Sequence, residues 1–188
     1  MGSSKFGAGP TLVGSVAIPL NAVEISSNND LILCTNLEAP QVDQELGELF
    51  VGINYLASAE RLTITVQQAR KLSCQDGLPN AYVKAYLIVD GKVAKKKKTG
   101  VKKCSQAPVW NEQLSMSLAQ KHTLSAELQL HVLHYDRMGT AARALGQVTL
   151  RLEANPSLDR FWRDVLAGRS VNPRWLALSA PTSPATTA

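Results

Sequence analysis

Cysteine is scarce in this chain, and long apolar segments are missing. Only three cysteines occur in 188 residues, Cys34, Cys74 and Cys104, with no C-x-x-C pair and no histidine at zinc-finger spacing. A disulfide-rich secreted scaffold and a zinc finger are therefore excluded, and a reducing, cytoplasmic setting is expected. No apolar run approaches the ~18 residues that span a bilayer, and the N-terminus carries no signal-peptide core. Any membrane contact is expected to be peripheral.

Motifs of catalysis are missing as well. The chain contains no G-x-S-x-G, no H-E-x-x-H and no glycine-rich phosphate loop. His131 and His134 are three residues apart on a predicted strand, where side chains alternate, so they point to opposite faces and do not form a pair. We predict a protein that is not an enzyme and that holds no cofactor and no metal.

The most prominent feature that is present is a run of lysines. Seven of the 20 Lys and Arg residues fall within residues 92–103, KVAKKKKTGVKK. They are Lys92, Lys95, Lys96, Lys97, Lys98, Lys102 and Lys103. Strict alternation would place Lys92, Lys96 and Lys98 on one face of a strand and Lys95 and Lys97 on the other, so neither face can enter a core. The segment is predicted to be a surface strand.

Two interpretations of this strand are open. Lysine on an edge strand prevents sheets from joining edge to edge, which accounts for two or three lysines but not for seven. The net charge of the chain is only +5, so the charge forms a patch, which is typical of surfaces that bind phosphate-bearing partners. Nucleic acid is not expected, because no aromatic residues alternate with the lysines to stack on bases.

Short apolar segments separated by turn signals recur from residue 48 onward. The predicted strands comprise residues 47–56, 61–69, 81–89, the lysine strand, 110–118, 127–134, 144–152 and 174–178. Asp90-Gly91 is a hairpin signal between the third strand and the lysine strand. Regular short strands without intervening helices predict an all-β fold, an eight-stranded antiparallel β-sandwich.

One late segment has helical periodicity instead. In NPSLDRFWRDVLAG the apolar residues fall at Leu158, Phe161, Trp162, Val165 and Leu166, with Pro156 near the start and Gly168 just past the end. We predict a short amphipathic helix whose aromatic pair packs on the core of the sandwich. The polar residues 179–188 are predicted to be a disordered tail.

The order of these features resembles a known family. Residues 47–178 look like a C2 domain of the synaptotagmin type, specifically the second, membrane-distal one of the pair. The resemblance rests on NAYVKAYLIVDGKVAKKKKTGVKK, APVWNEQLSMSL, HVLHYDRMG, ALGQVTLRL and FWRDVL. Residues 1–40 are similar to the tail of the preceding first C2 domain, and 41–46 to the linker that follows it.

The resemblance also implies where a calcium site would lie. Calcium-responsive members place five aspartates on two loops, and here only Asp76 and Asp136 match a ligand position. Asn80 and His134 stand at the second and third positions, and the fifth falls within residues 141–143. Two carboxylates and one amide oxygen cannot supply the six to eight oxygens that calcium takes, so a calcium-independent domain is predicted.

Alternatives for these loops stay open. They are either ordinary solvated loops or a tip that faces the membrane without calcium, since Arg137 and Arg143 match the charge of Asp76 and Asp136. A zinc site formed by His134, Asp136 and Asp76 is a further alternative, although a histidine with hydrogen-bond partners in a loop is commoner.

The function that we predict is binding of anionic phospholipids, phosphoinositides in particular, through the lysine strand. By resemblance, the setting is vesicle trafficking and exocytosis, with the protein peripheral on the cytosolic face of a vesicle or the plasma membrane. The alternative is an adaptor that binds SNARE or clathrin-adaptor proteins through the same strand. The resemblance also implies a docking motif at Trp175 and Leu178, although Leu176 replaces the histidine of that motif.

Overall fold

The computed structural model describes residues 46–74, 77–135, 142–152 and 156–181. The chain divides into two units, Met1–Gln44 and Glu45–Ala188, and all described residues belong to the second. The predicted N-terminal tail and the loop residues Asp76 and Asp136 lie outside the described residues.

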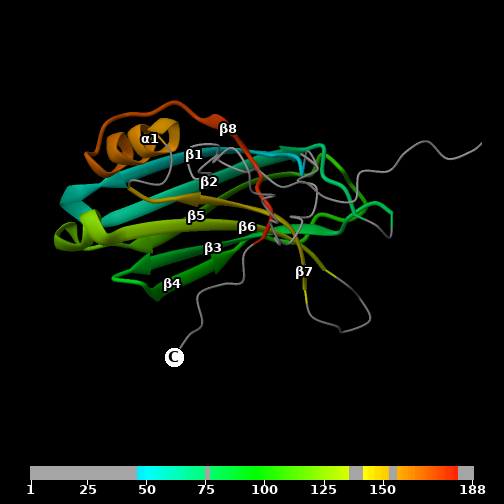
Figure 1. Ribbon diagram of the computed structural model, residues 1–188, viewed down its shortest axis with the longest axis horizontal. Helices are drawn as coiled ribbons and strands as arrows, with labels where there is room; N and C mark the ends of the chain where they lie inside the picture. Colours follow the sequence, from blue (N-terminus) through cyan, green and yellow to red (C-terminus); the bar gives the residue numbers. More distant parts are fainter. Residues whose placement is uncertain (1–45, 75–76, 136–141, 153–155, 182–188) are drawn as a thin grey trace, which may run out of the picture. The chain divides into compact units, whose positions relative to one another are not determined.

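Two antiparallel four-stranded sheets face each other (Figure 1). The first has the order β5-β2-β1-β8 and the second the order β4-β3-β6-β7. The strands are β1 (Glu48–Leu56), β2 (Arg61–Arg70), β3 (Ala81–Val89), β4 (Lys92–Lys98), β5 (Val109–Ser117), β6 (Ala126–His134), β7 (Arg143–Leu150) and β8 (Arg174–Ala177). The predicted all-β sandwich of eight strands is confirmed, with boundaries within a few residues of those predicted.

The core forms between the sheets from the alternating apolar residues of each strand. In β1 and β2 these are Leu49, Val51, Ile53, Tyr55, Leu62, Ile64 and Val66, all buried. The buried hydroxyl of Tyr55 donates to the carbonyl of Leu118 at 3.0 Å, so its polar atom is satisfied inside the sandwich.

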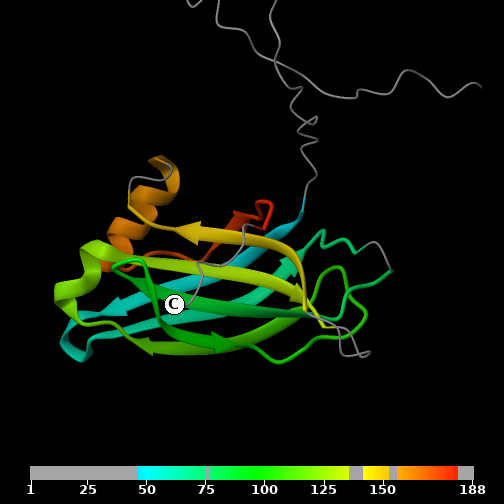
Figure 2. The same ribbon diagram turned by 60° about the horizontal axis from the view of Figure 1, so that its bottom comes forward.

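Helix α1 (Pro156–Leu166) closes one end of the sandwich, as the side-by-side placement of α1 and β1 in Figure 1 shows. The turned view in Figure 2 shows the helix, in orange, at the same end of the sheets. Phe161, Trp162 and Val165 are buried in the core, and the Trp162 indole N–H donates to the carbonyl of Ala126 at 3.1 Å. Gly168 follows the helix with φ of +70°, a conformation that glycine adopts without a Cβ penalty. The predicted packing role of the aromatic pair is confirmed.

After β8 the chain crosses to the second sheet. The backbone N–H and carbonyl of Ser179 both bond Gln147 of β7, at 2.9 and 3.0 Å. This pairing covers part of the outer edge of β7, so ordered hydrogen bonding continues one residue past Leu178. Within the described ranges, no helix is long and apolar enough to cross a bilayer.

Candidate functional site

The lysine strand is the edge strand of its sheet. β4 pairs only with β3, and Lys92, Lys95, Lys96, Lys97 and Lys98 are all exposed. The register places Lys98 opposite Lys84 and Lys96 opposite Tyr86. Because cross-strand partners point to the same side, these four side chains share the outer face of the sheet. We refer to this group, together with Tyr82, as the basic face.

A bulge changes the side to which the first residues of β4 point. Lys95 pairs with Leu87 and Val93 with Ile88, so Ala94 is an extra residue in the ladder. Lys92 is opposite Val89 and therefore points to the same side as Lys95 and Lys97. The prediction that Lys92 shares a face with Lys96 and Lys98 is wrong, because the bulge reverses the alternation.

The basic face contains a shallow depression. Its lining residues are Tyr82, Lys84, Lys96, Lys97 and Lys98, and its volume is about 340 Å³. The Lys84 ammonium lies 4.9 Å from the ring centroid of Tyr86, at cation–π distance. Lys84 and Tyr82 were not predicted to take part, although alternation along AYVKAYLIV places both on the face of the strand away from the buried Val83 and Ala85.

Lys102 and Lys103 follow the strand but do not belong to it. The backbone of Lys102 exchanges two hydrogen bonds of 2.8 Å with Ala81, at the start of β3. Thr99, which is buried, separates them from Lys98 and accepts the Val83 N–H at 3.0 Å through Oγ1. The lysines thus follow the edge of β3 from Val89 to Ala81, with Lys102 half-buried and Lys103 exposed.

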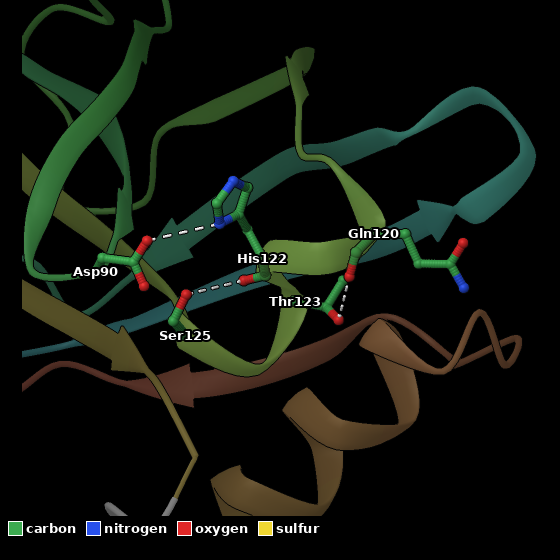
Figure 3. Close-up of polar contacts among 5 residues, drawn as sticks. All are labelled: Asp90, Gln120, His122, Thr123 and Ser125. Carbon is green, nitrogen blue, oxygen red and sulfur yellow. Dashed lines mark hydrogen bonds and ion pairs between the residues drawn. The ribbon is translucent and has the colours of Figure 1, made fainter.

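The turn that leads into β4 lies against a second element. Asp90 and Gly91 have φ of +50° and +75°, as the predicted two-residue hairpin requires. The carboxylate of Asp90 lies 3.5 Å from Nδ1 of His122, which belongs to the 3₁₀ helix η3 (Gln120–Ser125) (Figure 3). Hydroxyls of Thr123 and Ser125 donate to carbonyls of Gln120 and His122 within the same turn.

Two of the candidate calcium positions, Asn80 and His134, contact each other at the opposite end of the sandwich. Nδ1 of His134 accepts the backbone N–H of Asn80 at 3.0 Å. The side-chain oxygen of Asn80 accepts the N–H of Cys104 at 3.1 Å, and its amide nitrogen donates to the carbonyl of Tyr135 at 3.4 Å. Both side chains therefore connect loops. No group of three metal-ligating residues occurs among the residues that the structure describes, which include neither Asp76 nor Asp136.

The two residues of the predicted docking motif lie in different environments. Leu178 is buried in the core. Trp175 is half-buried on the outer side of β8, with its ring centroid 5.0 Å from that of Phe50 and the Arg70 guanidinium 4.2 Å above it. Only Trp175 is accessible without unfolding.

His131 lies beside the basic face, opposite Lys84, and was not predicted to belong to it. The imidazole is 4 % exposed, and its ring meets the Tyr86 ring edge-on at a centroid distance of 5.1 Å. Burial, with a smaller effect from the nearby Lys84 ammonium, lowers the pKa of His131 below the ordinary histidine value. His131 and His134 point to opposite sides of β6, as predicted, because their contacts are with Tyr86 and Asn80 respectively.

Comparison with known proteins identifies similar sequences and folds. The family model of the C2 domain matches residues 60–176. Human synaptotagmin-5 is 33% identical over 178 residues, which cover 90% of this chain and 44% of that protein. Synaptotagmin 1 of Drosophila melanogaster is 30% identical over 176 residues, 90% of this chain and 36% of that protein. The chain thus spans less than half the length of these two relatives.

Solved structures show the same architecture. The third C2 domain of the KIAA1228 protein aligns with a TM-score of 0.60 and 21% identity, covering 78% of this chain and 97% of that one. The first C2 domain of human synaptotagmin XIII aligns with a TM-score of 0.52 and 23% identity, covering 70% and 86%. At sequence identities of 21% and 23%, this structural similarity establishes the fold alone.

Proposed function

Because the chain belongs to the C2 domain family, we propose that residues 47–178 are a non-catalytic module of the second, membrane-distal synaptotagmin type that binds anionic phospholipids through β4. The proposed headgroups are phosphoinositides, and the proposed location is the cytosolic face of a vesicle or the plasma membrane during trafficking and exocytosis. The observation that carries the proposal is the exposure of five lysines on one sheet edge, beside a depression lined by lysine and tyrosine.

Charge alone supports reversible recruitment. Each lysine near an anionic surface contributes about 1 kcal/mol, so four or five of them contribute about 4 to 5 kcal/mol. Lys95 and Lys97 leave the strand on the side away from the basic face but stay exposed at the rim of the sandwich, so they can approach the same surface. Such an interaction is weakened by salt, since the Debye length is about 8 Å at physiological ionic strength.

The depression supports a preference for a headgroup with several phosphates. Its volume of about 340 Å³ lies at the small end of ligand pockets, which begin near 300 Å³. Three lysines of the basic face line it from two strands, Lys84 from β3 and Lys96 and Lys98 from β4, so phosphates on different sides of one ring can each meet an ammonium group. Lipids with one phosphate each present their phosphates in the plane of the membrane surface. They would therefore contact only the lysines that protrude furthest from the basic face.

Binding is proposed to be independent of calcium. Asn80 and His134 occupy two of the positions where the resemblance implies carboxylate ligands, and both are engaged in hydrogen bonds between loops. The Asn80 oxygen already accepts the Cys104 N–H, and the His134 imidazole offers nitrogen and not the oxygen ligand that calcium takes. The remaining ligands would be too few for a hard cation that requires six to eight oxygens.

Co-sedimentation with vesicles tests the proposal. Three compositions are compared with and without calcium: phosphatidylcholine alone, phosphatidylcholine with phosphatidylglycerol, and phosphatidylcholine with a phosphoinositide at equal surface charge. We expect no binding to the first, binding to the second, tighter binding to the third, and no effect of calcium.

Two double variants separate headgroup recognition from charge. Lys96→Gln with Lys98→Gln removes two lysines that line the depression, whereas Lys92→Gln with Lys95→Gln removes two from the same strand that do not. The first pair should lose more affinity for phosphoinositide vesicles, and both should lose the same for phosphatidylglycerol. If wild-type protein ignores anionic vesicles but captures SNARE or clathrin-adaptor proteins, the adaptor function replaces the lipid function.

A further inference from the structure

One titratable side chain beside the basic face has no part in the function proposed above. His131 on β6 is directly opposite Lys84 on β3, and the Tyr86 ring contacts both the Lys84 ammonium and the His131 imidazole. A single aromatic ring separates His131 from the Lys84 ammonium, so a change in the charge of His131 alters the electrostatic potential at the basic face. A histidine in this place adds a charge near the binding surface only when it is protonated.

A chain of hydrogen bonds determines which nitrogen can take up a proton. The amide nitrogen of Gln129 donates to Oε1 of Glu127 at 2.6 Å, which leaves the Gln129 oxygen as an acceptor. Nε2 of His131 lies 3.1 Å from that oxygen and must therefore carry hydrogen. In this tautomer Nδ1 carries no hydrogen and is the nitrogen at which the ring takes up a proton. Protonation at Nδ1 would leave both of these hydrogen bonds intact, with the Glu127 carboxylate at the far end of the series.

The groups that face His131 determine how readily its imidazole takes up a proton. On β3 they are Lys84, Tyr82 and Tyr86; on β4, one strand further, Lys96 and Lys98; on β6, Glu127 through Gln129; and on β7, the uncharged Gln147. Burial first, and the Lys84 ammonium second, make an imidazolium unfavourable while the basic face is empty. A bound phosphate would reverse the local balance, because it neutralises the lysines and attracts a further positive charge.

We propose that His131 is the proton-binding residue of the basic face, so that an anionic phosphate headgroup seated over Lys84 and Tyr86 binds together with a proton and is held more tightly at acidic pH. The inference rests on the lipid-binding function proposed above. By linkage, a ligand that raises the pKa of a group binds more tightly as the pH falls through that range. Each unit by which the ligand raises the pKa gives up to about a tenfold gain in affinity.

The test measures binding of the whole chain to vesicles of phosphatidylcholine with phosphatidylglycerol between about pH 8 and pH 6. Phosphatidylglycerol is chosen because its phosphodiester does not titrate there, whereas the phosphomonoesters of phosphoinositides gain a proton near pH 6. The quantity compared is the ratio of affinities at the two pH values. We expect a ratio of about three to ten in wild-type protein and a ratio close to one in His131→Gln.

The two other histidines of the chain provide matched controls. His122→Gln and His134→Gln remove the remaining imidazoles, which contact Asp90 and Asn80 and not the basic face. Both variants should keep the wild-type ratio. Acidification at the lipid surface affects all variants equally, so the difference between them is diagnostic.

A second measurement does not depend on any variant. Calorimetry of wild-type binding at neutral pH, in buffers of different ionisation enthalpy, should show uptake of a fraction of one proton. Equal heats in all buffers would overturn the inference, as would an unchanged ratio in His131→Gln. Both of these results would leave lipid binding itself intact. Absence of binding to phosphatidylglycerol at every pH would instead refute the proposed function, and this inference with it.

Discussion

Neutralising the centre of the lysine strand should abolish most lipid binding without unfolding the domain. The perturbation is the simultaneous change of Lys95, Lys96, Lys97 and Lys98 to glutamine. All four side chains are exposed, and no ion pair among the described residues includes them. Because their removal leaves the core unchanged, the free energy of unfolding should change by no more than about 0.5 kcal/mol per substitution.

The binding loss follows from the number of contacts. Four lysines at about 1 kcal/mol each amount to about 4 kcal/mol, and about 1.4 kcal/mol is a factor of ten, so affinity should fall by two to three decades. Co-sedimentation with phosphatidylglycerol or phosphoinositide vesicles at low salt measures the affinity, and thermal denaturation by circular dichroism measures the stability.

A control variant removes the same amount of charge elsewhere. The control changes four of the exposed basic residues outside β4 to glutamine: Arg61, Lys121, Arg151 and Arg160. Each quadruple variant lowers the formal net charge from +5 to +1, that is, by four. The control should lose much less affinity. An equal loss in both would show that binding depends on total charge and not on the strand, and unfolding of the β4 variant would show that the lysines are structural.

Three further predictions concern calcium, pH and the helix. Millimolar calcium should leave the melting temperature unchanged, whereas a site occupied at about 100 times its Kd would add about 2.7 kcal/mol; an upward shift would contradict calcium independence. Because burial lowers the pKa of His131 in the folded state, the unfolded chain takes up its proton at higher pH. The free energy of unfolding should therefore decline as pH falls below about 6.5 and level off below the folded-state pKa, and His131→Gln should reduce this decline in urea titrations at several pH values. Trp162→Phe should cost about 1 to 3 kcal/mol in urea, because it removes buried volume and leaves the carbonyl of Ala126 without its indole donor; a neutral result would show that the helix contributes little to the domain.

Much of the fold was predictable because it depends on local patterns. The alternation of Leu49, Val51, Ile53 and Tyr55 corresponds directly to burial, since a strand with one face on a core has a period of two. The helical spacing of Phe161, Trp162 and Val165 likewise defined the buried side of α1. The exposure of β4 followed from its composition, because neither side of a strand with this many lysines can be desolvated.

Pairing between distant strands combines these pieces into a site. The order β4-β3-β6-β7 places Lys84 between the lysine strand and His131, and no local pattern encodes which strands become neighbours. The bulge at Ala94 reversed the side to which Lys92 points, and alternation along the chain cannot reveal an inserted residue. Local patterns were therefore enough to specify a β-sandwich with a basic strand at its surface. The folded arrangement was needed to show that this strand borders a depression lined by lysines and Tyr82, with the buried His131 beside Lys84 on the same face, because the ladder hydrogen bonds join three strands whose side chains meet there.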